Sequence, residues 1–415
     1  MDFGTSNSLV SYVRPGEPAR VLTIDNNHSD PHIMRSLMYF PFEDGEPSFG
    51  QNAIQNYIKA QGQGRFIRSV KKFLPAKSFK ATQIKGQIYS LEEIIGRFLR
   101  ELKHRADALT GEDVQRVLLG RPARFHIDDE RDQLAQDRLK EAAERAGFEV
   151  IAFCPEPLAA ALDYQQQIQR PKKVLVVDLG GGTSDFTIIR LKPGPQETLE
   201  TLGLNGVSVA GDKLDGSLMT TFIGPYFGTE VQYKFPMGNN VLTMPPELKS
   251  RLASPADITL LLKSDIMSFI RDLKKSILSP ADEDRLENLF ALVEENLGFA
   301  LYEEIEKTKQ TVCSEQVSRF QFENSGIEIS LNLTYDDFIQ CNSSHFNQIF
   351  GAIDSLMESA QLSPQEIDTV FTTGGTSRVP FIQKKLVEMF GAEKLHHQEA
   401  FHSVIERPGR KSQLN

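Results

Sequence analysis

The sequence has little of several features that define other classes of protein. Its 415 residues include only three cysteines, Cys154, Cys313 and Cys341, and these are widely separated. An odd number of distant cysteines predicts neither a disulfide framework nor a paired zinc site. The sequence has no run of about 18 apolar residues that could span a bilayer, and its N-terminus lacks the basic and apolar regions of a signal peptide. We therefore expect a cytoplasmic protein with no membrane partner.

The sequence also lacks an excess of basic charge and a Walker-type phosphate loop. Its formal net charge is −10. Because nucleic acids recruit basic surfaces, we do not expect a nucleic-acid partner. A Gly-x-x-x-x-Gly-Lys motif is missing, so any nucleotide must bind by another route. With 40% hydrophobic residues the chain can bury a large core, and its length predicts two or three domains.

Two short acidic turns are the most informative features that the sequence does contain. They occupy residues 2–7 and 178–185, and each combines aspartate with glycine and hydroxyl residues. Successive amide groups in such a turn form a concavity that binds anions, and a carboxylate beside it can hold hydrated magnesium. Apolar segments at residues 174–177 and 186–191 flank the second turn, which predicts a tight β-hairpin.

A third turn follows an apolar segment at residues 369–373 and contains Gly374 and Gly375. We expect this segment to be a strand and the turn to open a helix. The N-terminal end of a helix presents free amide groups and the positive end of its dipole to an anion. Three turns of this kind indicate half-sites that face each other and clamp a triphosphate.

The order of these turns resembles the nucleotide-binding domain of DnaK-type heat-shock chaperones, within the actin-like ATPase superfamily, and most closely their short YegD-like relatives. Further motifs carry the resemblance over nearly the whole chain. Residues 120–125 resemble a strand ending in Pro-Ala-x-Phe, residues 155–161 resemble the Glu-Pro-x-Ala-Ala interlobe helix, and residues 68–74 resemble a lysine-bearing stretch.

This resemblance implies an α/β, two-lobed actin-like ATPase fold. Each lobe would be a mixed sheet with flanking helices, and the ATP cleft would lie between the lobes. We expect lobe I at residues 1–168, lobe II at 169–415, and an inserted, enlarged helical subdomain at about 216–345. Only 40 residues follow Gly375, so we expect no peptide-binding domain and expect any chaperone-like effect to need another protein.

The resemblance also implies a set of site residues. Asp2 and Asp178 would hold magnesium through water, with potassium as a further candidate ion. The catalytic residues would be Lys71, Glu156, Asp178 and Asp185: Lys71 stabilises developing charge, and Glu156 and Asp185 orient water or ions. ATP or ADP would contact Gly4, Thr5, Ser6, Asn7, Gly180, Gly181, Gly182, Thr183, Glu306, Lys309, Gln310, Gly374, Gly375, Thr376 and Arg378. Gln310 replaces an arginine of the family, and an amide cannot stack on adenine as a guanidinium does.

The local patterns predict further elements. We expect strands at residues 9–13 and 114–119, and a helix at 130–146 whose apolar face ends at Gly147. A helix should begin near residues 279–282 and continue through Leu301 to Gln310. Residues 157–169 should join the lobes as a helix. Residues 398–404 should begin the last helix and residues 405–415 should be a disordered tail.

Three functions agree with this sequence. The preferred function is that of a chaperone-like, slow ATPase whose nucleotide state controls lobe closure and the binding of a partner or co-chaperone. The second is a small-molecule kinase of the same superfamily. The third is a nucleotide-binding scaffold without turnover. ADP formation without an added acceptor would distinguish the first from the second, and binding without turnover would identify the third.

Overall fold

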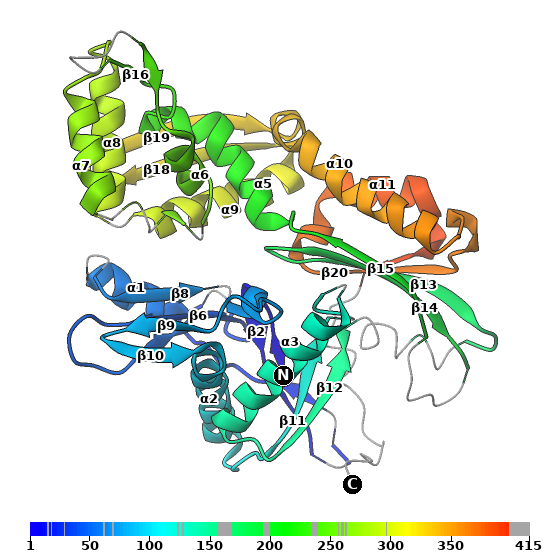
Figure 1. Ribbon diagram of the computed structural model, residues 1–415. Helices are drawn as coiled ribbons and strands as arrows, with labels where there is room; N and C mark the ends of the chain where they lie inside the picture. Colours follow the sequence, from blue (N-terminus) through cyan, green and yellow to red (C-terminus); the bar gives the residue numbers. More distant parts are fainter. Residues whose placement is uncertain are drawn as a thin grey trace.

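The chain folds into a mixed α/β structure, described here by a computed structural model (Figure 1). The structure describes residues 1–14, 16–17, 19–28, 30–60, 63–68, 70–122, 124–126, 128–156, 164, 168–193, 200–234, 240–255, 257–258, 261, 264–295 and 297–397. The predicted helix at 157–169 lies mostly outside the described residues, and the predicted segments 398–404 and 405–415 lie wholly outside them. One large hydrophobic core lies within residues 3–148 and another within 175–390. We refer to residues 1–156 as the N-terminal part and to residues 168–397 as the C-terminal part.

Small sheets and helices make up the N-terminal part. Its elements are β1 (Asp2–Phe3), β2 (Asn7–Leu9), β3 (Ser11–Tyr12), β4 (Arg20–Val21), β5 (Met34–Arg35), β6 (Leu37–Phe40), β7 (Ser48–Phe49), α1 (Gly50–Lys59), β8 (Arg65–Arg68), the 3₁₀ helix η1 (Val70–Phe73), β9 (Ala81–Ile84), β10 (Gln87–Ser90), α2 (Leu91–Thr110), β11 (Arg116–Arg121), α3 (Asp129–Ala146) and β12 (Val150–Pro155). Strand β2 lies between β1 and β5, β6 lies between β7 and β8, and β11 pairs in parallel with β12.

Helices α2 and α3 pack closely because small residues line their contact. The predicted helix at 130–146 is confirmed as α3, and its predicted apolar face is buried: Ala135, Leu139, Ala142, Ala143 and Ala146. A side chain at Gly96 of α2 would lie only 3.0 Å from the carbonyl oxygen of Ala142. Gly147 ends α3 with φ +100°, the left-handed conformation that glycine adopts without strain.

A five-stranded sheet forms the centre of the C-terminal part, with the strand order β15-β14-β13-β20-β21. Its strands and neighbouring helices are β13 (Lys172–Leu179), β14 (Ser184–Leu191), β15 (Glu200–Val207), α10 (Tyr335–Ser359), η5 (Pro364–Glu366), β20 (Thr369–Thr373), η6 (Gly375–Arg378), α11 (Pro380–Phe390), η7 (Ala392–Lys394) and β21 (Leu395–His397). Strands β13 to β15 form an antiparallel meander, whereas β20 runs parallel to both β13 and β21. The strands predicted in β13, β14 and β20 are confirmed.

The chain between β15 and α10 forms a large, mainly helical region. It contains α5 (Gly211–Leu218), the π-helix η2 (Met219–Ile223), η3 (Gly224–Phe227), β16 (Gln232–Tyr233), β17 (Leu242–Thr243), α6 (Pro246–Leu252), α7 (Ser264–Lys274), α8 (Asp282–Glu294), α9 (Gly298–Glu315), β18 (Val317–Asn324) and β19 (Ile327–Thr334). One hydrophobic core runs from β13 through this region to α11. The region therefore shares its core with the sheet, and the hairpin β18–β19 lies within the interval that the sequence indicated as helical.

Two predicted elements are wrong in their extent. The predicted strand at 9–13 is two strands, because β2 pairs with β5 whereas β3 pairs with β4. The predicted continuous helix through Leu289 and Leu301 is interrupted between Glu294 and Gly298. At Gly298 a side chain would come within 2.8 Å of Ile258, so the start of α9 is set by a close tertiary contact.

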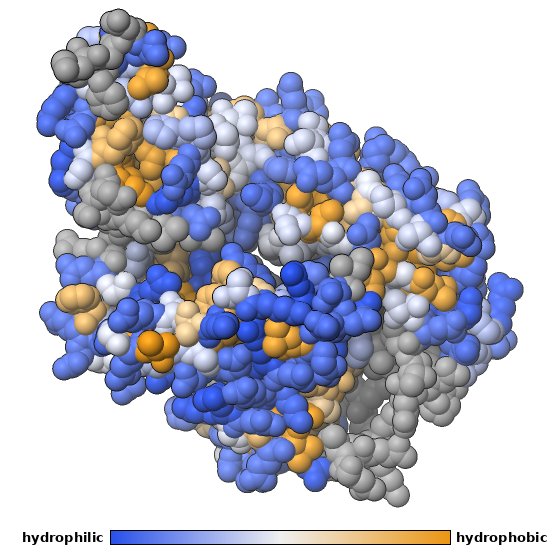
Figure 2. All heavy atoms as spheres, in the orientation of Figure 1, coloured by the Kyte–Doolittle hydropathy of each residue, from blue (hydrophilic) through white to orange (hydrophobic). Residues whose placement is uncertain are grey.

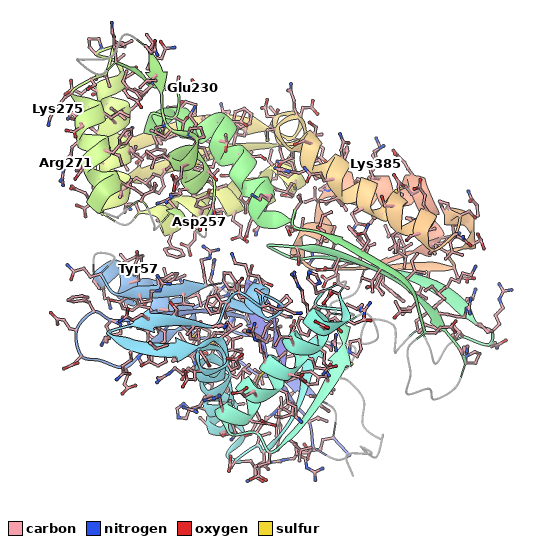
Figure 3. The ribbon with its side chains drawn as sticks, viewed as in Figure 1. Tyr57, Glu230, Asp257, Arg271, Lys275 and Lys385 are labelled. Carbon is pink, nitrogen blue, oxygen red and sulfur yellow. The ribbon has the colours of Figure 1, made fainter. Side chains whose placement is uncertain are left out.

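An aromatic contact joins the N-terminal and C-terminal parts. Phe299 of α9 is buried with Tyr39 and Tyr57 of the N-terminal part, and its ring centroid lies 5.0 Å from that of Phe66 in an edge-on arrangement. Nearby, Arg68 of β8 donates a hydrogen bond to the carbonyl oxygen of Pro255. Figure 3 shows Tyr57 and Asp257 on the facing sides of the two parts. Apolar and polar contacts thus connect the two parts at this point.

The surface is mainly polar. Hydrophilic residues cover most of the face in Figure 2, and hydrophobic atoms form separate groups on it. Among the helices that the structure describes, none combines the length and the apolar character needed to cross a membrane.

Candidate functional site

The second turn connects β13 to β14 as the sequence predicts. The strands pair so that Asp178 lies opposite Asp185 and Leu179 opposite Ser184. The amide of Gly180 donates to the carbonyl oxygen of Thr183 at 3.0 Å, which closes the turn. Pairing across the hairpin therefore brings its two aspartates, at the ends of the acidic motif, to the same position along the strands.

The first turn lies against the second. Strands β1 and β2 pair across it, and a side chain at Gly4 would come within 2.2 Å of the carbonyl oxygen of Asn7. A side chain at Gly181 would lie 2.5 Å from the hydroxyl of Ser6. This Ser6 hydroxyl is buried and has no hydrogen-bond partner among the described residues. The two turns thus face each other across a narrow gap that holds an unsatisfied polar atom.

The third turn touches the second from the other side. Gly374 has φ +82°, and a side chain there would lie 2.2 Å from the carbonyl oxygen of Leu179. The Thr376 hydroxyl donates to the carbonyl oxygen of Gly180 at 2.8 Å. The turn continues into η6 and then α11, as predicted, but Arg378 Nε donates to His397 of β21 at 3.2 Å. All three glycine turns therefore meet at the second one.

Five charged side chains gather beside these turns. Lys71 of η1 lies 3.2 Å from Glu156, and both are largely buried. The charges of Asp2 and Asp178 also act on Lys71, and the charges of Glu156 and Asp185 act on Asp178. The structure thus brings together every residue that the sequence assigned to catalysis or to magnesium. Lys72, the neighbour of Lys71, is exposed, and its ammonium group lies 5.1 Å from the Phe73 ring centre.

Burial changes the acidity of this cluster. Burial and repulsion by Glu156 raise the pKa of Asp2 and that of Asp178, each to about 7. Burial also raises the pKa of Asp185, to about 6. Burial lowers the pKa of Lys71, but attraction by Glu156 and Asp2 outweighs it and raises this pKa overall. Four carboxyl groups share one ammonium group, so the cluster favours the entry of a cation.

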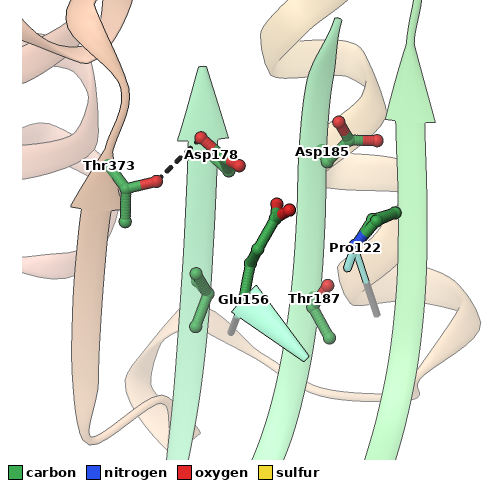
Figure 4. Close-up of a pocket in the computed structure, with 7 residues that line it drawn as sticks. Pro122, Glu156, Asp178, Asp185, Thr187 and Thr373 are labelled. Atoms are coloured by element: carbon green, nitrogen blue, oxygen red, sulfur yellow. Dashed lines mark hydrogen bonds between the residues drawn. The ribbon is translucent and has the colours of Figure 1, made fainter. Parts of the chain in front are cut away.

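A small pocket opens at the acidic cluster (Figure 4). It is lined by Pro122, Glu156, Val176, Asp178, Asp185, Thr187 and Thr373, and its volume of about 20 Å³ is enough for a water molecule. The Thr373 hydroxyl donates to Asp178 at 2.7 Å, which fixes that carboxylate at the edge of the pocket. Within the described chain, no group of three or more His, Cys, Asp or Glu side chains is placed to hold a metal ion.

Helix α9 carries the three residues predicted to bind adenosine. Lys309 pairs with Asp215 of α5 at 2.8 Å, and Glu306 lies 4.0 Å from Arg35 of β5. Gln310 is exposed. The structure therefore places Glu306 and Lys309 in a charged network with neighbouring elements, and it places Gln310 outside that network.

Sequence reasoning missed several charged residues around this network. Asp212 of α5 donates its amide hydrogen to the Gly181 carbonyl oxygen at 2.7 Å, so α5 begins beside the second turn. Burial raises the pKa of Asp215 to about 6, although Lys309 opposes that shift. Gly211 and Asp212 repeat the combination of glycine with an acidic residue that marks the turns. This pattern could have identified Asp212 and Asp215 from the sequence. No local motif indicated Arg35.

The fold and these turns fit one class of proteins, the DnaK-type heat-shock chaperones, and the chain belongs to the Hsp70 family. The Hsp70 protein model matches residues 1–235 and 294–400. This family has the two-lobed actin-like ATPase fold, binds ATP or ADP with magnesium, and consists of chaperones. Residues 236–293, between the two matched ranges, contain β17, α6, α7 and most of α8.

Among individual proteins, the chain is similar to the chaperone protein DnaK of Mycoplasmopsis agalactiae. The two are 26% identical over 389 residues, which cover 94% of this chain and 53% of the relative. The chain therefore spans about half the length of this relative.

Proposed function

We propose that this chain binds ATP with magnesium between its two lobes and hydrolyses it slowly, and that its nucleotide state controls lobe closure and partner binding. Lobe I is residues 1–168 and lobe II is residues 169–415, with an inserted subdomain at about 216–345. The observation that supports this function most is the meeting of three glycine turns beside the cluster of Asp2, Lys71, Glu156, Asp178 and Asp185.

The acidic cluster fits magnesium held through water. The pKa values of Asp2 and Asp178 are raised, which means that the neighbouring groups of the protein do not offset the negative charge of these two carboxylates. Magnesium keeps several of its waters and needs only one or two carboxylates, which suits a pair of aspartates without a third direct ligand. When bound, magnesium would attract phosphate oxygens and screen the negative charge of the cluster.

The three turns fit phosphate groups. In the first two turns, Gly4, Thr5, Ser6, Asn7, Gly180, Gly181, Gly182 and Thr183 offer backbone amides and hydroxyls to β and γ phosphate oxygens. The buried Ser6 hydroxyl would gain a hydrogen-bond partner in this way. In the third turn, the N-terminal end of η6 would face the α phosphate. The residues of this turn are Gly374, Gly375, Thr376 and Arg378.

Lys71 is the group best placed to act on the reacting phosphate. Its ammonium group stabilises negative charge as it develops and positions the attacking water. Glu156 holds this ammonium group at 3.2 Å and keeps it protonated. Asp185 accepts a hydrogen bond from Thr183 at 2.9 Å, which leaves its second oxygen to orient water or potassium in the pocket.

The nucleoside would lie against α9. Glu306 accepts ribose hydroxyls, and Lys309 uses the ammonium hydrogens not donated to Asp215. Gln310 offers an amide at the edge of the base but no guanidinium plane, so base selectivity should be weaker than with arginine.

Contact between the turns connects nucleotide binding to lobe movement. Because Ser6 of lobe I and Gly181 of lobe II nearly touch, a triphosphate between them requires the lobes to separate at this point. A phosphate group held by both turns would then set the distance between the lobes. The aromatic contact of Phe299 with lobe I would respond to that change.

A partner surface is expected on the inserted subdomain around residues 257–301, because this interval includes much of the segment outside the Hsp70 match. Arg271 of α7 and Lys275, which directly follows α7, lie on the outer side of this subdomain in Figure 3. Since α7 and α8 share the core of lobe II, the surface should be tested with Arg271→Glu and Lys275→Glu rather than with a deletion.

Calorimetric titration with ATP and magnesium, followed by measurement of ADP, tests the proposed function. We expect saturable binding that needs magnesium, and slow ADP formation without an added acceptor. Binding without ADP would identify a scaffold instead, and ADP formed only with an added hydroxyl acceptor would identify a small-molecule kinase. Absence of binding would contradict all three functions.

A further inference from the structure

Arg138 of α3 donates hydrogen bonds to four backbone carbonyl groups of one loop. The two N–H groups of its Nη1 are shared among the carbonyl oxygens of Phe73 at 3.3 Å, Leu74 at 3.0 Å and Ala76 at 3.0 Å, and its Nη2 donates to that of Phe79 at 3.0 Å. A guanidinium group carries five N–H donors in one rigid plane. A single side chain therefore fixes the path of residues 73–79.

This loop begins two residues after Lys71, the lysine of the acidic cluster. Lys71 lies in η1, and the amide of Leu74 donates to the carbonyl oxygen of Lys71 at 3.1 Å. Leu74 is fully buried, and the rings of Phe73 and Phe79 stack with centroids 5.0 Å apart. Any shift of this loop must move η1 and with it the backbone that carries Lys71.

Arg138 is itself held in place by α2. Its Nε lies 3.0 Å from a carboxylate oxygen of Glu92, and the side chains of the two residues are only 12% and 14% exposed. Glu92 lies in the first turn of α2, which Ser90 and Glu93 cap through reciprocal hydrogen bonds. Hydrogen bonds with a charged partner are about twice as strong as neutral ones. Arg138 thus connects η1 to the closely packed pair of helices α2 and α3.

We propose that Arg138 is a positioning residue, which fixes η1 through four carbonyl groups so that the Lys71 ammonium stays beside Glu156. This inference rests on the proposed function, because it concerns the same lysine. Without the guanidinium group the four carbonyl groups lose their donors, and η1 can move relative to Glu156. A displacement of about 1 Å at a reacting group can lower a rate by about 100-fold.

Acylation of lysines tests the positioning without any need for turnover. An amine-reactive acetylating reagent is added to the wild type, Arg138→Lys and Arg138→Met, and fragment-ion mass spectrometry measures labelling of Lys71 and Lys72. We expect labelling of the buried Lys71 to rise about tenfold in both variants, because local opening exposes it. Labelling of Lys72, which is already exposed, should stay constant and serves as the internal reference.

Two further variants distinguish a loss of Lys71 positioning from a general loss of folding. Arg138→Lys keeps a cation for Glu92, so it remains folded and informative if Arg138→Met does not, yet an ammonium group cannot span four carbonyl groups. Arg145→Met removes another guanidinium group from the same helix, one that pairs with Glu141. We expect this control to label Lys71 as the wild type does. Unchanged Lys71 labelling in Arg138→Lys would overturn the proposal.

Turnover provides an independent test. We expect Arg138→Lys to lower kcat about tenfold while ATP affinity stays within about twofold, and to have no further effect on kcat in a Lys71→Ala background. Additive losses in kcat would contradict a role through Lys71. If the wild type forms no ADP, the proposed function fails and the labelling still decides the positioning. If the wild type is active and labelling is unchanged, only the positioning fails.

Discussion

Individual carboxyl groups of the acidic cluster bind their protons more tightly in the folded chain than in the unfolded chain. The pKa of Asp178 is raised from 3.8 to about 7 by burial and by Glu156. Between pH 3.8 and about pH 7 the folded state therefore binds more protons than the unfolded state. The nucleotide-free protein loses stability as the pH rises through this range. The same burial that favours a cation at the site thus destabilises the empty site near neutral pH.

Replacement of Asp178 by asparagine should weaken magnesium-dependent nucleotide binding. A neutral amide loses the attraction to the hydrated ion, and we expect affinity to fall about 10–100-fold, the range for lost outer contacts of a metal. Without nucleotide, the same variant should be more stable than the wild type at pH 7.5, with a melting temperature higher by about a few degrees. Calorimetry and thermal unfolding measure these two effects, and unchanged magnesium dependence would contradict the assignment.

The affinity for magnesium nucleotide should also depend on pH. Because binding requires the ionised forms of Asp2 and Asp178, whose pKa values are about 7, we expect affinity to rise from about pH 6 to pH 8. Asp178→Asn should show a shallower rise, which reflects the titration of Asp2 and of the nucleotide itself. An affinity that falls over this range in the wild type would show that the carboxylates do not carry the ion.

Loss of Lys71 should affect turnover far more than binding. Its charge matters most as the transition state forms, so Lys71→Ala should lower kcat about 100–1,000-fold, or about 2.7–4 kcal/mol, with a much smaller change in ATP affinity. Lys72→Ala is the matched control, because Lys72 is adjacent but exposed. Normal turnover in Lys71→Ala together with a loss in Lys72→Ala would show that the other lysine acts.

At this scale, the sequence predicted residues that lie in motifs and missed residues that act through tertiary contacts. Glycine, aspartate and hydroxyl residues in the turns are recognisable because the local backbone needs them. The role of Arg138 could not be predicted, because its partners in residues 73–79 are backbone carbonyl groups, which every residue carries, and its carboxylate partner Glu92 is distant in the sequence. Asp215 and Arg35 meet α9 only after the chain has folded.

At the scale of elements, the role of the third turn in ATP binding can be tested by a substitution at Gly374, whose backbone has a positive φ. Alanine at this position would adopt φ +82° and meet the carbonyl oxygen of Leu179 at 2.2 Å. We expect Gly374→Ala to push the third turn away from the second and to weaken ATP binding at least about tenfold, measured by titration. Gly326→Ala is the matched control, because Gly326 has φ +83° with nothing within 4 Å. This control should lose only about 1–2 kcal/mol of stability and bind ATP normally.

Elements whose limits depend on local pattern were predicted well. Strand β20 is five buried residues in a row, and the alanine face of α3 repeats at helical spacing. Elements whose limits depend on partners were not. The change of pairing partner between Leu9 and Ser11, and the close contact of Gly298 with Ile258, involve residues distant in the sequence. No local pattern could reveal them.

For the whole molecule, the contact of Phe299 with lobe I should slow the separation of the lobes. Phe299→Ala removes a buried aromatic pair, which is worth about 0.5–1.5 kcal/mol beyond its buried area. We therefore expect ADP release, followed with a fluorescent analogue by stopped flow, to be about 2–10-fold faster. Phe42→Ala is the control, because Phe42 is 72% exposed and should leave release unchanged. Equal release rates in all three proteins would show that this contact does not limit opening.

The chain between Tyr233 and Ile277, which includes most of the segment outside the Hsp70 match, leaves the C-terminal part and returns to it at one place. Tyr233 forms a β-bridge with Ile277, and the amide of Leu278 donates to the carbonyl oxygen of Gln232 at 3.1 Å. The helices of this stretch nevertheless belong to the hydrophobic core of the C-terminal part, in which Ile270 and Leu273 are both buried. Although this stretch of chain begins and ends at one place, its helices share the hydrophobic core of the C-terminal part. Its removal would therefore expose apolar surface.

The edge-on contact between Phe66 and Phe299 has a spectroscopic consequence. The chain contains no tryptophan, so a single introduced indole would be its only strong intrinsic fluorophore. Phe66 is half-buried, so part of the larger ring can extend into solvent. Phe66→Trp would place that fluorophore against Phe299 of the C-terminal part. Its emission would shift to longer wavelength when water reaches the ring, which makes the distance between the lobes measurable in solution without any attached dye.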